Sequence, residues 1–238
     1  MTIGIIPARF RSNRLPGKPL AQLGDFNMIQ LVYLQCKKAT CLDRIIVATD
    51  DQRIVESIHE IEGEVTMTDV HHLSGTDRCI EVAEKHLADH YINIQGDEPF
   101  IQPEDIDLVA NGLLKGAAVT TLKKQIEDVH EIDNPNCVKV VCDLDGKALY
   151  FSRSRIPYNQ GTTPKYFKHK GIYGFSRHAL NKIASLSPSS LERSESLEQL
   201  RWLECGMEIK VLDSPHETIS IDTEKDLEAA RKRINGKI

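Results

Sequence analysis

The stretch Ile3-Gly4-Ile5-Ile6-Pro7-Ala8, followed directly by Arg9, is the segment that decides the fold. It is a nearly continuous apolar run, which is typical of a β-strand buried on both faces of a parallel sheet. A polar loop over residues 9–19 follows, and then a helical pattern of apolar residues that begins at Met28 and ends near Ala39. Because a strand that leads through a loop into a helix is the first half of a βαβ unit, the segment predicts a parallel sheet.

The same alternation continues through the first half of the chain. Strands are predicted at residues 44–49, 64–67 and 91–95, and each is followed by a helical pattern. Beyond them, strand-like runs follow one another with few helices between them, at residues 119–122, 138–142, 148–152 and 168–175. We therefore expect a doubly wound sheet with an antiparallel or mixed portion.

Near the C-terminus, two helices (residues 191–204 and 224–235) are expected to flank two strands (209–212 and 218–221). The chain contains no repeat, no low-complexity tract and no linker-like segment. We therefore expect one compact domain over residues 1–238.

Composition limits the class of protein. The chain has 238 residues and a formal net charge of −5, which excludes nucleic-acid binding through a broadly basic surface. Its apolar runs are shorter than the ~18–20 residues of a membrane span. Its first arginines follow the N-terminal apolar stretch, whereas a secretory signal has its positive charges before that stretch. The six cysteines form no Cys-x-x-Cys pair. We expect a reduced cytoplasmic protein without a zinc site or membrane insertion.

The loop after the first strand is the first candidate site. Arg9, Arg14 and Lys18 lie within ten residues of one another, and Gly17 allows backbone N–H groups to approach a ligand closely. Ligands of open α/β sheets bind at this end of the strands, and such cations suit a polyphosphate. The loop matches neither the P-loop nor the dinucleotide-binding pattern. The alternative is a solvated basic loop.

Two acidic residues follow other predicted strands. Asp97 comes after Gly96 at the end of the fourth strand, where a carboxylate could hold Mg²⁺, although a plain turn is equally consistent with the motif. Asp222 precedes Thr223, which forms a capping-box pattern with Asp226. If Thr223 is the helix cap, Asp222 is available as a second metal ligand; the alternative is that Asp222 itself caps the helix.

Two further patterns leave alternatives open. Ser74-Gly75-Thr76-Asp77-Arg78 opens a helix, and its hydroxyls and amides could contact a nucleotide or simply cap that helix. Glu195, Glu198, Gln199 and Trp202 fall on one helical stripe, opposite Leu197, Leu200 and Leu203 that we expect to face inward. Such a stripe is usually solvated surface. His71 and His72 lack metal-ligand spacing and are interpreted as ordinary histidines.

Taken together, the motifs resemble the 3-deoxy-manno-octulosonate (Kdo) cytidylyltransferases. They occur in order over essentially the whole chain: Ile6-Pro7-Ala8-Arg9-Phe10, Arg14-Leu15-Pro16-Gly17-Lys18-Pro19-Leu20, Val47-Ala48-Thr49-Asp50-Asp51, Ser74-Gly75-Thr76-Asp77-Arg78, Asn93-Ile94-Gln95-Gly96-Asp97-Glu98-Pro99, Tyr150-Phe151-Ser152-Arg153-Ser154-Arg155-Ile156-Pro157, Lys168-His169-Lys170-Gly171-Ile172-Tyr173-Gly174, Ser196-Leu197-Glu198-Gln199-Leu200-Arg201 and Ile221-Asp222-Thr223. Each motif alone is weak, and the ordered set is specific.

The resemblance implies a nucleotide-diphospho-sugar transferase-like fold, a doubly wound mixed sheet in three α/β/α layers. It also implies a cytoplasmic homodimer with a sugar-binding and dimerisation region at roughly 125–205. The implied reaction joins CTP and Kdo, with Mg²⁺ as cofactor, to give CMP-Kdo and pyrophosphate for lipopolysaccharide biosynthesis.

The resemblance also implies roles for particular residues. The catalytic set would be Arg9, Arg14 and Lys18 on the triphosphate, with Asp97 and Asp222 on the metal. The nucleotide would further be contacted by Pro7, Ala8, Ser74, Thr76, Arg78 and Gln95. The sugar pocket would be lined by Gln95, Arg153, His169, Tyr173, Glu198 and Gln199.

One departure from the family pattern, one residue that bears on the substrate and two alternatives accompany the resemblance. Asp25-Phe26-Asn27 stands where the family commonly has a Gly-Lys-Pro-like turn, so the way in which the first helix begins is not predicted. Glu98 matches the enzymes for Kdo itself, whereas a related branch that uses 8-amino-Kdo carries Gln at this position. The alternative substrates are 8-amino-Kdo or another acidic sugar such as a sialic acid. The alternative class is a non-catalytic nucleotide-binding protein. Asp143-Leu144-Asp145 is interpreted as a hairpin turn rather than a glycosyltransferase metal motif.

Overall fold

The computed structural model describes residues 1–11, 15–161, 164–217 and 219–236. The chain forms two compact units: unit 1 is Met1–Asp107 with Thr218–Ile238, and unit 2 is Leu108–Glu217. The expected single domain, with a sugar-binding and dimerisation region at roughly 125–205, stays a prediction. Across the described residues, no helix combines the length and apolarity that a membrane span requires.

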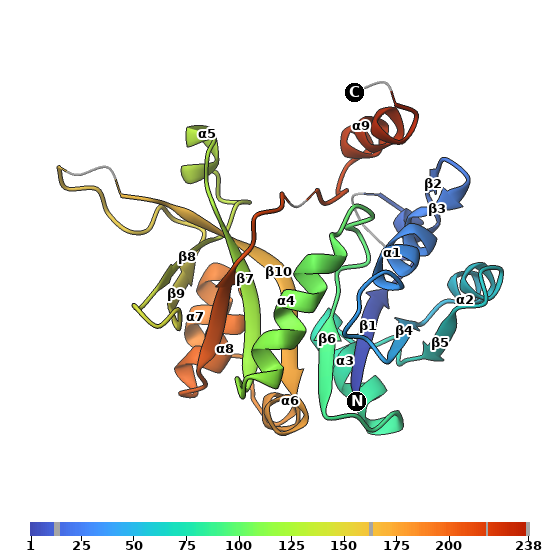
Figure 1. The fold of residues 1–238 in the computed structure, drawn as a ribbon, viewed down its shortest axis with the longest axis horizontal. Coiled ribbons are helices and arrows are strands. Elements are labelled where there is room, and N and C mark those ends of the chain that lie inside the picture. The colour runs from blue at the N-terminus through green and yellow to red at the C-terminus, as the bar shows by residue number, and fades with distance from the viewer. Residues whose placement is uncertain (12–14, 162–163, 218, 237–238) are drawn as a thin grey trace. The chain divides into compact units, whose positions relative to one another are not determined.

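Unit 1 contains a parallel sheet in the order β6-β1-β4-β5 (Figure 1). Its elements are β1 (Thr2–Ala8), η1 (Lys18–Leu20), β2 (Gln22–Leu23), β3 (Phe26–Asn27), α1 (Met28–Cys36), β4 (Arg44–Thr49), α2 (Gln52–His59), β5 (Glu64–Met67), α3 (Gly75–Lys85), β6 (His90–Asn93) and α9 (Glu224–Ile234). Helix α4 (Pro103–Leu114) contains the boundary between the two units.

The core of unit 1 follows from the apolar runs of its strands. All but one of the β1 residues are buried, and Ile3, Ile5 and Ile6 are 0% exposed. Helices α1 and α3 both contact β1, so a strand without alternation is buried by its neighbours as predicted. The predicted α/β class is confirmed.

Unit 2 has the mixed character that the second half of the sequence predicts. Strand β10 is antiparallel to β7, while β11 is parallel to β7, and β8 pairs with both β10 and β9. Its elements are β7 (Val119–Gln125), α5 (Val129–Ile132), β8 (Lys139–Cys142), β9 (Ala148–Ser152), β10 (Phe167–Ser176), α6 (Arg177–Ala184), α7 (Ser190–Glu195), α8 (Gln199–Glu204) and β11 (Ile209–Asp213).

One predicted helix is wrong. Residues 191–204 form two helices, α7 and α8, because Ser196 adopts a left-handed conformation with φ 52° and ends α7. The predicted polar stripe therefore does not exist. Trp202 is 0% exposed and Gln199 is 5% exposed, so both are buried, while Leu203 is only partly buried.

A second correction concerns the strand expected at residues 218–221. Its described part, residues 219–221, belongs to no strand, and Thr218 lies outside the described residues. The Ile221 N–H instead donates one hydrogen bond of 3.0 Å to the carbonyl oxygen of Asp97. This bond fixes the segment against the turn after β6.

The departure at Asp25-Phe26-Asn27 is accommodated locally. Phe26 and Asn27 form β3, which pairs with β2 across a tight turn containing Gly24. Asn27 then caps α1, because its side chain accepts from the Gln30 N–H while the Gln30 side chain accepts from the Asn27 N–H. The first helix therefore begins normally.

Gly96 supplies a stability prediction, because a Cβ at this position would lie 2.7 Å from the Pro7 carbonyl oxygen. A backbone oxygen cannot move aside cheaply, so Gly96→Ala should lower the free energy of unfolding by about 1–3 kcal/mol. Urea denaturation measures this change. The matched control is Gly75→Ala, whose Cβ would meet only side-chain atoms of Pro7 and Asn93, at 3.4 Å or more. Equal stability of the two variants would contradict the prediction.

Candidate active site

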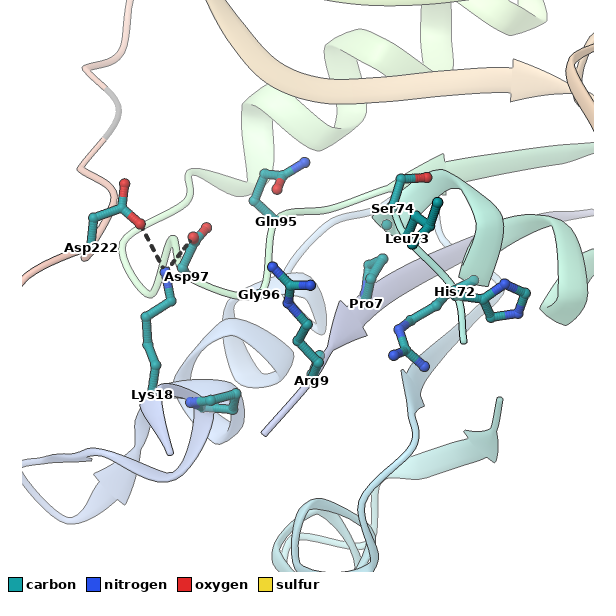
Figure 2. Close-up of a pocket in the computed structure, with 14 residues that line it drawn as sticks. Pro7, Arg9, Lys18, His72, Leu73, Ser74, Gln95, Gly96, Asp97 and Asp222 are labelled. Atoms are coloured by element: carbon teal, nitrogen blue, oxygen red, sulfur yellow. Dashed lines mark hydrogen bonds and ion pairs between the residues drawn. The ribbon is translucent and has the colours of Figure 1, made fainter. Parts of the chain in front are cut away.

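A pocket of about 370 Å³ opens in unit 1 where β1 and β6 end (Figure 2). The residues that line it are Pro7, Ala8, Arg9, Lys18, Pro19, His72, Leu73, Ser74, Gly75, Arg78, Gln95, Gly96, Asp97 and Asp222. Ligands of open α/β sheets bind at the carboxyl ends of parallel strands, and this pocket occupies that position. It brings together most of the residues predicted for the nucleotide and the metal.

Lys18 and two carboxylates form the charged centre of the pocket. The Lys18 Nζ lies 2.6 Å from Asp97 Oδ2 and 3.1 Å from Asp222 Oδ1 (Figure 2). Gly17, in a left-handed conformation with φ 71°, starts the short η1 turn that carries Lys18. The two carboxylates, which are distant in sequence, are therefore each within one ion-pair distance of the same nitrogen.

The position of Asp222 depends on the helix that follows it. Thr223 is the cap of α9, because its hydroxyl accepts from the Asp226 N–H while the Asp226 carboxylate accepts from the Thr223 N–H. The alternative in which Asp222 caps the helix is therefore wrong. Its backbone N–H donates to Asp226, and its carboxylate faces Lys18.

The carboxylate pair suits a hard divalent cation. Asp97 and Asp222 offer oxygen ligands that converge on one point, and their side chains are 27% and 35% exposed, so both can be reached from solvent. The described residues include no cluster of three or more potential metal-ligating side chains. Mg²⁺ commonly uses one or two carboxylates and completes its shell with water and substrate phosphates, so two are sufficient.

The predicted phosphate-binding cations are placed only in part. Arg9 is exposed and lines the pocket, extending toward the segment of Gln95 and Gly96 in Figure 2. Lys18 lines the same pocket. Arg14 lies outside the described residues, so its role stays a prediction.

The segment at the start of α3 combines structural roles with access to the pocket. Ser74 caps α3 through a capping box with Asp77, and it also lines the pocket. The Arg78 side chain is 4% exposed, and its guanidinium donates to Asp50, to Thr68 and to the Asp69 carbonyl. Arg78 therefore ties the start of α3 to the segments that follow β4 and β5.

Three residues differ in position from what the motifs suggested. Thr76 is 3% exposed and is absent from the described pocket lining. His72, interpreted as an ordinary histidine, lines the pocket, and its Nε2 lies 2.6 Å from Glu81 Oε2. Leu73 also lines the pocket although it is 90% exposed. For His72 and Leu73, the signal available in the sequence was their position directly before Ser74, the cap of α3.

The residues predicted for the sugar pocket divide between the units. Gln95 lines the pocket of unit 1, whereas the other five belong to unit 2. Arg153 is held by carbonyl oxygens, with Nε 2.6 Å from that of Glu195 and a terminal nitrogen 2.9 Å from that of Pro135. Glu198 accepts from Arg201 at 3.0 Å.

His169 and Tyr173 lie in an aromatic cluster with Trp202. The His169 and Tyr173 rings are 5.2 Å apart, and Tyr173 meets Trp202 edge-on at 5.0 Å. Burial, followed by the charge of Glu198, raises the pKa of Tyr173 well above its ordinary value, so its hydroxyl stays protonated. That hydroxyl and the Trp202 indole N–H are buried without a hydrogen-bond partner among the described residues.

Comparison with known proteins shows the family of this chain. The sequence profile of the cytidylyltransferase family matches residues 3–209, so the chain belongs to that family. The 3-deoxy-manno-octulosonate cytidylyltransferase of Solibacter usitatus is 46% identical, covering 99% of this chain and 95% of the relative. The protein of the same name from Cytophaga hutchinsonii is 45% identical, covering 94% of each chain.

A solved structure is similar over the whole chain. The CMP:2-keto-3-deoxy-manno-octonic acid synthetase complexed with CTP is 39% identical, with a TM-score of 0.96, and the match covers 100% of this chain and 99% of that one. The similarity includes the ends of β1 and β6, where the pocket lies.

His169 gives a prediction on pH dependence, because burial lowers its pKa from 6.5 to about 3. As pH falls below 6.5, the His169 ring becomes protonated in the unfolded chain but stays neutral in the folded chain. The free energy of unfolding therefore decreases between pH 6.5 and pH 3. From pH 7.5 to pH 5, wild type should lose up to about 2 kcal/mol more unfolding free energy than His169→Gln.

Urea denaturation at the two pH values measures this difference. The matched control is His130→Gln, which replaces an exposed histidine of α5. If wild type and His169→Gln lose stability in parallel, the interpretation of His169 as a neutral ring in the folded protein is wrong.

Proposed function

We propose that the chain transfers CMP from CTP to the anomeric hydroxyl of Kdo, giving CMP-Kdo and pyrophosphate. The observation that carries this proposal is the meeting of Lys18, Asp97 and Asp222 in a pocket at the ends of β1 and β6. The similarity to proteins named 3-deoxy-manno-octulosonate cytidylyltransferase, at about 45% identity over nearly the full length, supports the choice of substrates.

The chemistry is an in-line displacement at the α-phosphorus of CTP. The anomeric oxygen of the sugar forms a bond to that phosphorus, the bond to the bridging oxygen of pyrophosphate breaks, and the hydroxyl proton passes to solvent. We assign no side chain as general base. The remaining task of the protein is to hold two negatively charged reactants together and to stabilise the leaving group.

Charge neutralisation is therefore the main requirement. Kdo carries a carboxylate and CTP is a polyanion, and two like charges at ~4 Å repel by roughly 4 kcal/mol at an effective dielectric constant near 20. Arg9 and Lys18 line the pocket and supply positive charge. In this proposal they bind the triphosphate and stabilise the charge that builds on departing pyrophosphate, and Arg14 is expected to join them.

Asp97 and Asp222 would hold Mg²⁺ in this proposal, since their oxygens converge on one point. When bound, the ion would neutralise phosphate charge and lower the pKa of a coordinated hydroxyl. The protein's own contribution is to fix both carboxylates. The Ile221–Asp97 backbone hydrogen bond and the capped start of α9 perform that task.

Gln95 and Tyr173 are among the residues proposed to contact the sugar. The buried Tyr173 hydroxyl and Trp202 indole N–H have no partner among the described residues, and an unpaired buried donor is costly. In this proposal a sugar hydroxyl or the sugar carboxylate accepts from the Tyr173 hydroxyl. Arg153, His169, Glu198 and Gln199 complete the proposed set.

The wider setting is proposed on the same basis. CMP-Kdo would serve as the activated sugar for lipopolysaccharide biosynthesis, in the cytoplasm. We also propose that the chain acts as a homodimer and binds neither nucleic acid nor membranes.

Pyrophosphate release from CTP tests the reaction. With Mg²⁺ present, the enzyme should release pyrophosphate when Kdo is added, and kcat/KM for Kdo should exceed that for 8-amino-Kdo or sialic acid by at least about tenfold. A coupled phosphate assay measures the rate. Faster release with 8-amino-Kdo would change the substrate, and no release with any of the three would favour a non-catalytic nucleotide-binding protein.

Asp97→Asn tests the carboxylate pair. Because the amide is neutral and a poorer ligand, kcat/KM should fall on the order of 100-fold, and the Mg²⁺ concentration for half-maximal rate should rise. Initial rates over a range of Mg²⁺ measure both effects. The control is Asp89→Asn, at an exposed aspartate that pairs with the N-terminal amine. Unchanged turnover and metal dependence in Asp97→Asn would remove Asp97 from this role.

A further inference from the structure

The ammonium of Lys18 occupies the point on which the two carboxylates converge. It lies 2.6 Å from Asp97 and 3.1 Å from Asp222, and the Lys18 side chain is only 14% exposed (Figure 2). An ammonium has three N–H donors and no acceptor, so it can pair with both carboxylates at once. The protein therefore holds its own cation at the place proposed for the metal.

This internal cation opposes the binding of a divalent ion. The carboxylate oxygens that would coordinate the ion already accept hydrogen bonds from Lys18. An ion bound at the same oxygens would also stand a few ångströms from a positive charge, in a half-buried site where repulsion is poorly screened. The ion and the ammonium therefore compete for the same two carboxylates.

The ammonium leaves the carboxylates more readily when another anion receives it. Lysine carries its charge on a flexible four-carbon stem, and its ammonium pairs readily with phosphate. Lys18 lines the pocket beside Arg9, where the proposed function places the triphosphate. We propose that Lys18 keeps the carboxylate pair closed to divalent cations in the free enzyme and releases it when the phosphates of CTP take up its ammonium.

This inference, which rests on the proposed function for the identity of the nucleotide, has a thermodynamic consequence. The nucleotide takes up the Lys18 ammonium that competes with the metal, and the metal takes up the carboxylates that compete with the phosphates for that ammonium. Bound nucleotide therefore raises the affinity of the enzyme for metal, and bound metal raises its affinity for nucleotide. The free enzyme would bind metal weakly, and the site would fill only when substrate is present. Lys18 thereby acts as a positioning residue for the metal as well as a ligand for phosphate.

Mn²⁺ binding without nucleotide tests the first half of the proposal. Electron paramagnetic resonance of unbound Mn²⁺ gives the affinity for the whole protein. Lys18→Met removes the charge and nearly keeps the length, and it should bind Mn²⁺ at least about tenfold more tightly than wild type. Lys18→Arg keeps the charge and should stay within about threefold of wild type.

Two controls make this measurement specific. Lys38→Met changes an exposed lysine that pairs with Gln35, and it should bind Mn²⁺ as wild type does. Adding Asp97→Asn to Lys18→Met should abolish the tighter binding. Circular dichroism confirms folding, and Lys18→Gln replaces the methionine variant if that variant does not fold. Equal affinity in wild type and the neutral variant, or tight binding that survives loss of Asp97, would overturn the proposal.

Calorimetry of CTP binding in the presence of a chelator tests the second half. If the phosphates take up the ammonium, Lys18→Met should bind metal-free CTP at least about fivefold more weakly than wild type. Unchanged CTP affinity would show that the nucleotide does not recruit Lys18. These binding measurements are independent of turnover, so the inference can fail while Kdo-dependent pyrophosphate release succeeds, and the reverse outcome is equally recognisable.

Discussion

One backbone hydrogen bond, from the Ile221 N–H to the Asp97 carbonyl oxygen, joins the two acidic segments of the pocket. The turn after β6 and the segment before α9 lie far apart in the sequence, and nothing in their local sequence requires them to meet. Once they are joined, two negative charges face each other and need a cation. Lys18, carried by a short turn that starts at a left-handed glycine, is that cation. The charge balance of the pocket thus depends on chain topology.

Much of unit 1 could be predicted from the sequence, because its signals are local. The bounds of β4 and β5 are those expected from their apolar runs, and β1 is buried as a strand without alternation should be. The start of α9 was marked by the Thr223 capping box. The division between α7 and α8 was not predictable, because a serine with positive φ carries no pattern that distinguishes Ser196 from an ordinary helical residue.

The candidate site shows a similar limit. The sequence predicted Asp97 just after a strand and Lys18 in the loop that follows another strand, and the parallel arrangement brings both to one edge. It could not show which charges would pair, since the Lys18 contacts span 79 and 204 positions. Nor could it show that the Arg78 guanidinium would be buried against Asp50, because that depends on how α3 lies on the sheet.

The aromatic cluster of unit 2 has a practical consequence. Trp202 is the single tryptophan of the chain, it is 0% exposed, and the Tyr173 and Phe175 rings meet it edge-on. Its intrinsic fluorescence therefore originates from one place, next to a residue proposed to contact the sugar. The native protein carries a built-in optical reporter, through which events in unit 2 can be followed without attaching a label and separately from those in unit 1.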